Sequence, residues 1–373
     1  MIKINALERN KIQSWYAKQM VPHIRKKQRH IALRCGTDPF LQKFVWQLNH
    51  LTETEIRDIL LVQPEELLKK YDWIRQYVKL CDACAFFGAF HQTSPQIKDK
   101  RAARNEFIRK YDCVYLKQAF REAGLSEWDA ICSWKKLTVA IRHARKMRDE
   151  LNAAATQIFK YGFLDELEMR GLLVEKMNVP VCPYCNKQYI QPFPVGKDMR
   201  YLGDIDHILP KLFYSLFSLS LWNLVPCCKS CNQVFKRAST KRLLNPHERG
   251  FDCDCILELR YKTVRELVGI DEVSEMEWEV QPKSKSDAQE EIKNNIQTFH
   301  LNESYDYHKR DIQLVLRKRF LMGATGYGKS LKRIGVMSAI TEEPRLLYGV
   351  SLDPSKFQEE LLAKAIYDTI YYN

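Results

Sequence analysis

The chain has 373 residues, of which 28% are charged, and its formal net charge is +13 at pH 7. A positive surplus of this size favours a polyanionic partner, and no apolar run is long enough to span a bilayer, so we expect no membrane association. The 12 cysteines fall partly into C-x-x-C pairs, and we expect no secretory signal. We therefore expect a cytoplasmic protein in which the paired cysteines bind metal, and not a disulfide framework.

The N-terminal region, residues 1–175, is expected to be helical. Thr52 and Glu55 have the spacing of a capping box, and apolar residues at helical spacing follow them. The same spacing predicts further helices over residues 65–80, 135–148 and 164–175. Cys81 and Cys84 lie in an apolar, helix-like run without a second pair close by, so we interpret them as core thiols.

Two C-x-x-C knuckles lie in the middle of the chain, Cys182/Cys185 and Cys228/Cys231. Two such pairs can supply four thiolates to one tetrahedral zinc ion, which predicts a structural zinc site. The alternative is that these residues are buried free thiols. Cys227 makes the second knuckle ambiguous by one residue. Only Cys228 has the correct spacing to Cys231, so we interpret Cys227 as a packing residue.

An acid–histidine pair, Asp206-His207, lies between the knuckles in a short predicted strand that ends at Pro210. Adjacent residues of a regular strand point to opposite faces, so we expect a bend or bulge that lets both side chains reach one site. Asn223 precedes the second knuckle, and Asn232 directly follows it. The alternative interpretation is that the ring of His207 is simply hydrogen-bonded within the protein core and that Asn232 acts as a helix cap.

These residues together resemble the HNH, or ββα-metal, endonuclease family. The motifs of that family are C-x-x-C, Asp-His-Ile-x-Pro, Asn-Leu, a second C-x-x-C followed by His or Asn, and a basic residue soon after. The corresponding residues occur here in the same order, ending with Lys236. Many members have His where this chain has Asn232, but the HNH domain of the RNA-guided CRISPR nuclease also has Asn at its last ligand position.

The resemblance implies a role for each residue. His207 would be the general base that deprotonates a water, Asp206 and Asn232 would hold one Mg²⁺ or Mn²⁺ ion, and Asn223 would orient His207 or its loop. The chemistry agrees, because an ordinary histidine has a pKa of about 6.5 and hard oxygen ligands suit Mg²⁺. Asp204 is the competing metal ligand. The residues of this motif contact the phosphodiester, so they do not distinguish DNA from RNA.

Segments on either side of the second knuckle extend the resemblance to HNH effectors of bacterial anti-phage systems of the Septu and retron type, some of which pair with an ATPase. These segments are residues 220–226, 244–251 and 292–302. They imply a partner ATPase and a role in defence. His247, which lies in the second of these segments, would contact metal or phosphate, or it would be an ordinary surface residue.

The C-terminal region, residues 253–373, is expected to be mainly helical, with a strand at 278–281 and helices over 288–302, 305–322 and 354–371. Cys253 and Cys255 have the wrong spacing for a zinc knuckle. Residues 323–330 match the Walker A pattern, but a phosphate loop needs a preceding strand, and a charged helix-like run precedes this one. Basic stretches lie within residues 23–30, 98–109, 135–148, 309–319 and 329–333, and together they favour contacts with a nucleic-acid backbone.

The sequence therefore predicts an α+β protein that is predominantly helical, with an embedded zinc-stapled HNH domain at residues 176–252. The predicted function is a metal-dependent endonuclease that hydrolyses phosphodiester bonds in double-stranded DNA. Two alternatives stay open. One is a non-catalytic, zinc-stabilised module that binds nucleic acid as a regulator or scaffold, and the other is an RNA endonuclease.

Overall fold

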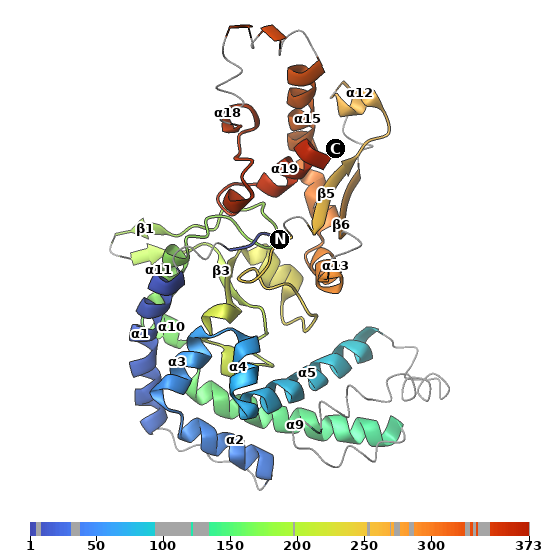
Figure 1. Cartoon of the computed structure of the whole chain (residues 1–373). Helices are drawn as coiled ribbons and strands as arrows, with labels where there is room; N and C mark the ends of the chain where they lie inside the picture. The colour runs from blue at the N-terminus through green and yellow to red at the C-terminus, as the bar shows by residue number, and fades with distance from the viewer. Residues whose placement is uncertain are drawn as a thin grey trace.

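The structure is a computed structural model that describes residues 1–4, 9–30, 38–93, 121, 134–196, 198–251, 254–268, 270–271, 277–282, 287–324, 329–330, 333–334 and 344–372. Over these residues the protein is mostly helical and contains three two-stranded antiparallel sheets. Figure 1 shows the N-terminal helices at the bottom, the central segment with β3 in the middle and the C-terminal elements at the top. The expectation of a predominantly helical α+β chain is confirmed. The domain boundaries stay a prediction.

Two N-terminal helices begin at side chains that satisfy their first N–H groups. Asp38 Oδ1 accepts hydrogen bonds from the backbone N–H groups of Phe40 and Leu41. Thr52 and Glu55 form the capping box that the sequence predicts. The described helices of this region are α1 (Arg9–His30), α2 (Pro39–Asn49), α3 (Glu53–Leu61), α4 (Pro64–Lys70), α5 (Asp72–Thr93), α9 (Trp134–Ile158), α10 (Phe163–Glu166) and α11 (Met169–Met177).

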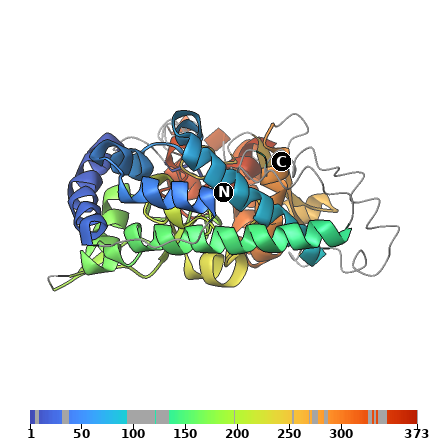
Figure 2. The same ribbon diagram turned by 90° about the horizontal axis from the view of Figure 1, so that it is seen from below.

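Two of the helices predicted in the N-terminal region are interrupted. The segment 65–80 is divided at Tyr71 into α4 and α5, and the segment 164–175 is divided into α10 and α11. Glu168 separates the latter pair and has a φ of 54°, a left-handed conformation that an α-helix cannot contain. Figure 2 shows α9 extended along the molecule, where it packs against α2 and α5.

The central segment contains two strand pairs and a terminal π-helix. Its elements are β1 (Phe193–Val195), β2 (Asp198–Arg200), β3 (Asp204–His207), the 3₁₀ helices η2 (Ser215–Phe217) and η3 (Leu221–Asn223), β4 (Leu224–Cys227) and the π-helix η4 (Ser230–Lys236). The strands β1 and β2 pair with each other, and β3 pairs with β4. The strand β3 falls within the segment where the sequence predicts one.

The C-terminal elements are β5 (Cys255–Arg260), α12 (Val264–Leu267), β6 (Glu277–Pro282), α13 (Gln289–Thr298), α14 (Leu301–Tyr305), η6 (Asp306–His308), α15 (Lys309–Ala324), α18 (Arg345–Tyr348), η7 (Pro354–Lys356) and α19 (Ala363–Tyr372). The strand predicted at 278–281 is confirmed by β6. The helix predicted over 288–302 is divided into α13 and α14 at His300, whose φ is 46°. The helix predicted over 354–371 is wrong in extent. Only η7 and α19 form, and Leu362, directly before α19, has a φ of 56°.

Buried apolar residues from all three regions form one continuous core. Hydrogen bonds attach the N-terminal helices to the loop between β3 and β4. Tyr16 Oη donates to the carbonyl of Leu219 at 2.8 Å, and Trp222 Nε1 donates to the carbonyl of Leu61 at 2.7 Å. The helical region therefore supports the acid–histidine strand directly. Among the described helices, none combines the length and the apolar character that crossing a membrane requires.

Candidate metal centre and acid–histidine strand

The four cysteines of the two knuckles converge in the interior. The sulfur atoms of Cys182, Cys185, Cys228 and Cys231 all lie within 4.8 Å of one another, and all four residues are buried. Cys185 Sγ and Cys228 Sγ are 4.0 Å apart. A tetrahedral zinc with Zn–S bonds of about 2.3 Å separates its sulfurs by about 3.8 Å. The cluster can therefore hold a structural metal ion such as zinc.

The surroundings of the cluster favour thiolate at two of its members, because hydrogen bonds, that from Cys182 first, lower the pKa of Cys185 as well. Hydrogen bonds from the other three thiols, that of Cys182 first, lower the pKa of Cys228. The backbone N–H of Cys231 lies 3.5 Å from Cys228 Sγ, as in a metal knuckle. Cys227 lies outside the cluster because it belongs to β4, where it pairs with Asp204. The choice of Cys228 over Cys227 is confirmed for the geometry of the cluster.

The first knuckle is also the attachment point of the C-terminal region. Asn186 directly follows Cys185 with a φ of 53°, and its side-chain amide donates to the carbonyls of Phe357 and Glu360 at 3.0 Å. Its carbonyl accepts a hydrogen bond from the backbone N–H of Leu362 at 2.8 Å. Tyr305 Oη donates to the Cys185 carbonyl at 2.7 Å. A metal in the cluster would therefore stabilise more than the two knuckles.

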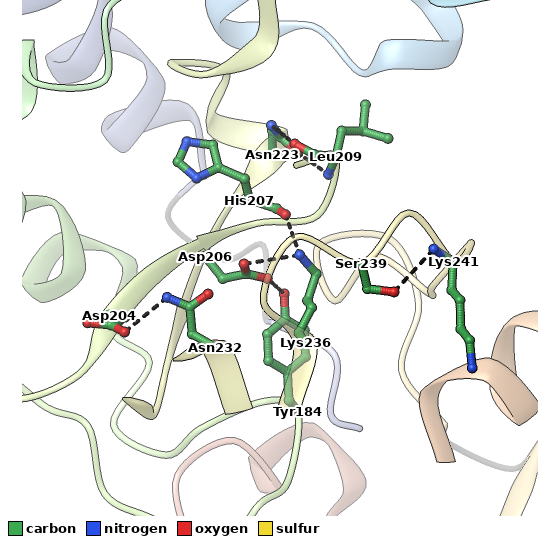
Figure 3. A network of polar contacts seen from close by, with 10 residues as sticks. All are labelled: Tyr184, Asp204, Asp206, His207, Leu209, Asn223, Asn232, Lys236, Ser239 and Lys241. Atoms are coloured by element: carbon green, nitrogen blue, oxygen red, sulfur yellow. Dashed lines mark hydrogen bonds and ion pairs between the residues drawn. The ribbon is translucent and has the colours of Figure 1, made fainter. Parts of the chain in front are cut away.

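The acid–histidine strand is regular. Asp206 pairs with Val225 and His207 pairs with Leu224, so the bulge expected at this position is absent from β3. In Figure 3 the Asp206 carboxylate and the His207 ring point to opposite sides of the strand. Ladder pairing with β4 preserves the pleat, and the pleat alternates the side chains. The structure therefore does not bring these two functional groups together.

Asp206 is buried, and both oxygens of its carboxylate have a partner. Tyr184 Oη donates to its Oδ2 at 2.6 Å, and Lys236 Nζ lies 3.1 Å from its Oδ1. The Lys236 side chain is completely buried, and its Nζ also donates to the His207 carbonyl at 2.6 Å. Burial raises the pKa of Asp206, and the Lys236 charge opposes that shift. A lysine ammonium therefore lies where a metal bound to Asp206 would have its charge.

The His207 ring lies on the other side of β3 and is oriented by a backbone carbonyl. Its Nε2 is 3.0 Å from the carbonyl oxygen of Ser218. Because a carbonyl oxygen only accepts, Nε2 carries the proton, and the lone pair of the neutral ring lies on Nδ1. Burial, with smaller effects of the Lys211 and Lys236 charges, lowers the pKa of His207 to about 3. The imidazole is therefore neutral at pH 7.

Asn223 fixes the loop that follows His207. Its Oδ1 accepts from the backbone N–H of Leu209 at 2.7 Å, and its Nδ2 donates to the carbonyls of Leu209 and Phe217 at 3.0 Å each. These bonds hold Leu209, just after β3, and Phe217, the last residue of η2, to the same side chain. Ser218, which holds the His207 ring, follows η2 directly, and its Oγ donates to the Phe159 carbonyl.

Asn232 lies beside Asp204 and not beside Asp206. Its Nδ2 donates to Asp204 Oδ2 at 2.9 Å, and Gln233 Nε2 donates to the same oxygen at 2.8 Å. Asp204 and Asn232 are both half-buried. An acid and an amide side by side offer the hard oxygen donors that Mg²⁺ prefers. Here the amide nitrogen of Asn232, and not its oxygen, faces the Asp204 carboxylate, so the structure pairs Asn232 with Asp204 and not with Asp206.

Other residues singled out in the sequence have ordinary structural positions. His247 is buried, and its Nε2 lies 2.8 Å from the Leu224 carbonyl, so a surface position for it is wrong. Cys81 and Cys84 are buried thiols on α5, as expected. The helix α15 precedes the Walker A match, whose residues 325–328 lie outside the described part. Cys253 and the basic stretch 98–109 also lie outside it.

Sequence reasoning missed three partners of the strand. Tyr184 lies inside the first knuckle, and nothing in a C-x-x-C pattern specifies a bond from its intervening tyrosine to an acid. Ser218 acts through its carbonyl, which any residue has, so its identity carries no signal. Tyr161 packs its ring against His207, with centroids 4.7 Å apart and an interplanar angle of 69°. It lies between α9 and α10, outside the motif.

Searches against known protein families, curated proteins and solved structures found no match to this chain.

Proposed function

We propose that this protein is a metal-dependent endonuclease of the HNH type that hydrolyses phosphodiester bonds in DNA. One observation carries the proposal. A neutral, buried His207 donates from Nε2 to a backbone carbonyl and keeps the Nδ1 lone pair, on a strand pair beside a four-cysteine cluster. A general base must be unprotonated at the working pH and fixed in orientation. Both conditions hold for His207, but burial lowers its pKa to about 3, so it is a weaker base than the ordinary histidine that the sequence predicts.

His207 would remove a proton from the attacking water through Nδ1. The Ser218 carbonyl would stabilise the imidazolium that forms, because it already accepts the Nε2 proton. Asn223 would keep that carbonyl in place by fixing the preceding loop. A divalent ion such as Mg²⁺ or Mn²⁺, when bound, would neutralise the charge that develops on the phosphate and the leaving oxygen.

Two acids compete for the catalytic metal. The motif assigns the metal to Asp206 and Asn232, but in this arrangement Lys236 and Tyr184 engage the Asp206 carboxylate. Asp204 already lies beside Asn232 and is more accessible. We infer that Asn232 acts with Asp204 in this arrangement, and that a role for Asp206 requires Lys236 to withdraw. Cleavage at limiting Mg²⁺ by Asp204→Asn and Asp206→Asn separates the two assignments.

A specific observation favours a second function. The buried pair between Asp206 and Lys236 neutralises the acid that the motif reserves for metal. That arrangement suits a zinc-stabilised module that binds nucleic acid without cutting it. The positive net charge supports nucleic-acid binding in either case.

A role as an anti-phage effector with a partner ATPase rests on the sequence resemblance of the flanking segments. An RNA substrate is the third alternative. Purified protein should be incubated with supercoiled plasmid and, separately, with labelled RNA, with Mg²⁺, with Mn²⁺ and without added divalent ions. Conversion of the plasmid to nicked or linear forms only with added metal supports the proposed activity. Intact plasmid and RNA under all conditions, with measurable binding, would favour the non-catalytic module.

A further inference from the structure

A second group of residues lies on one side of the His207 imidazole, and none of them belongs to the HNH motif. The Tyr161 ring packs edge-on to His207. Lys211 Nζ lies 4.3 Å from the centroid of the Tyr161 ring, and the guanidinium carbon of Arg170 lies 5.3 Å from the same centroid. Tyr161 and Arg170 come from the N-terminal helical region, and Lys211 follows β3. We call these three residues the Tyr161 cluster.

The carboxylate of Asp165 lies near both cations of the Tyr161 cluster and offsets only part of their charge. Arg170 pairs with Asp165 at 2.8 Å, but its covered Nε has no hydrogen-bond partner within the described part of the chain. Lys211 is exposed, and no carboxylate of the described residues lies within ion-pair distance of it. Partial burial, and then the charge of Arg170, lower the pKa of Lys211, and the charge of Asp165 opposes that shift. Two cations over one ring, with a single shared carboxylate, leave a positive charge that favours an anion.

The aromatic ring explains how like charges are held at this position. A cation over an aromatic face gains on the order of 1 kcal/mol, more when it is partly desolvated. Tyr161 therefore offers a common platform for Lys211 and Arg170. Because cations already lie over the ring, it is not free for stacking with a nucleobase. The chemistry of the cluster suits phosphate and not base recognition.

We propose that Arg170 and Lys211, held by Tyr161, bind a backbone phosphate of the nucleic acid next to the phosphodiester that His207 faces. This inference rests on the proposed function, because it places the substrate backbone at His207. It assigns part of the substrate site to the helical region, so the central segment alone would bind nucleic acid more weakly. The contact is independent of base sequence, since only the backbone is touched.

The test measures binding without cleavage. A short, fluorescently labelled DNA duplex is titrated with wild-type protein, Lys211→Met and Arg170→Gln in the absence of added divalent metal, over a series of salt concentrations. Lys293→Met is the matched control, because Lys293 is an exposed lysine on α13, on the far side of β3 from α11 (Figure 1). Lys211→Met keeps the alkyl stem at an exposed position, so it should fold normally, and thermal unfolding checks this.

We expect Lys211→Met and Arg170→Gln each to weaken binding by roughly three- to tenfold at about 0.1 M salt and to lower the salt slope by about one. Lys293→Met should bind like wild type. Lys211→Met that binds with the affinity and salt slope of Lys293→Met would overturn the proposal. The result is independent of catalysis. A wild-type protein that binds through the Tyr161 cluster but never cuts supports this inference and contradicts the nuclease. If the wild-type protein cuts DNA and Lys211→Met binds the duplex as tightly as wild type, the nuclease proposal is supported and this inference is contradicted.

Discussion

The four-cysteine cluster and the acid–histidine strand lie side by side in the same segment, yet they differ in how closely they match their motifs. The cluster brings all four motif residues together, with sulfurs within 4.8 Å of one another. The strand sends the Asp206 carboxylate and the His207 ring to opposite sides, where residues outside the motif's ligand set engage them. The motif residues alone form the cysteine cluster, whereas the surroundings of Asp206 and His207 are formed largely by residues outside the ligand set of the motif.

The difference has a physical cause. A C-x-x-C knuckle is a local turn, so its spacing alone brings two sulfurs to one point, and two knuckles need only one tertiary contact. Neighbouring residues on a strand diverge because of the pleat, and each must find its own partner. Asp206 meets Tyr184 and Lys236, and His207 meets the Ser218 carbonyl. The environment of each side chain on the strand therefore depends on tertiary contacts.

Loss of one cluster cysteine should have the largest effect, because metal binding at such a site is linked to folding by roughly 10 kcal/mol or more. Cys228→Ser should lose its metal and should not fold cooperatively. Cys227→Ser is the matched control, since Cys227 is equally buried but lies outside the cluster. Elemental analysis gives the metal content, and circular dichroism follows unfolding. Retention of one zinc per chain by Cys228→Ser would remove the metal centre from this account.

Lys236→Met tests the most unusual contact of the strand. It leaves the Asp206 carboxylate buried without its counter-charge, so the free energy of unfolding should fall by about 3–5 kcal/mol, while zinc content is unchanged. Urea denaturation measures the loss. The double variant Lys236→Met/Asp206→Asn should recover much of it, because the unpaired charge is gone. Equal losses in the single and double variants would show that the ion pair does not determine stability here.

The burial of His207 should appear as a pH dependence of stability. Its pKa is lowered from 6.5 to about 3 in the folded state, so below pH 6.5 the unfolded chain takes up a proton that the folded protein does not. Stability due to this residue is therefore complete above pH 6.5 and is lost progressively toward pH 3. Between pH 7 and pH 5, wild type should lose about 1–2 kcal/mol more than His207→Asn. Parallel losses in both proteins would mean that His207 titrates normally.

Several parts of this molecule could be predicted from the sequence because they depend on local rules. The Thr52 capping box, the β6 strand and the choice of Cys228 over Cys227 each follow from the spacing of a few residues. The break at Glu168 could not be predicted in this way, because a left-handed residue inside an apolar pattern leaves no signature in composition.

The contacts of the strand lie beyond such rules. Lys236 belongs to the motif, but its complete burial against Asp206 depends on how η4 packs on β3. The pairing of Asn232 with Asp204 instead of Asp206 depends on the same packing. The Ser218 carbonyl reaches His207 only because Asn223 and the N-terminal helices hold the intervening loop. Local sequence patterns identify the residues of the site, but the partners of those residues depend on the tertiary structure.

The cleavage rate of His207→Ala relative to wild type tests the central claim most directly. Single-turnover cleavage of a labelled DNA duplex should be measured with saturating Mg²⁺, and binding of the same duplex should be measured without added divalent metal. If His207 is the general base, cleavage should fall by about 10²–10⁴-fold, with affinity for the duplex and metal content unchanged. Cleavage by His207→Ala at the wild-type rate would contradict the assignment, and with it the proposal that this strand carries the chemistry.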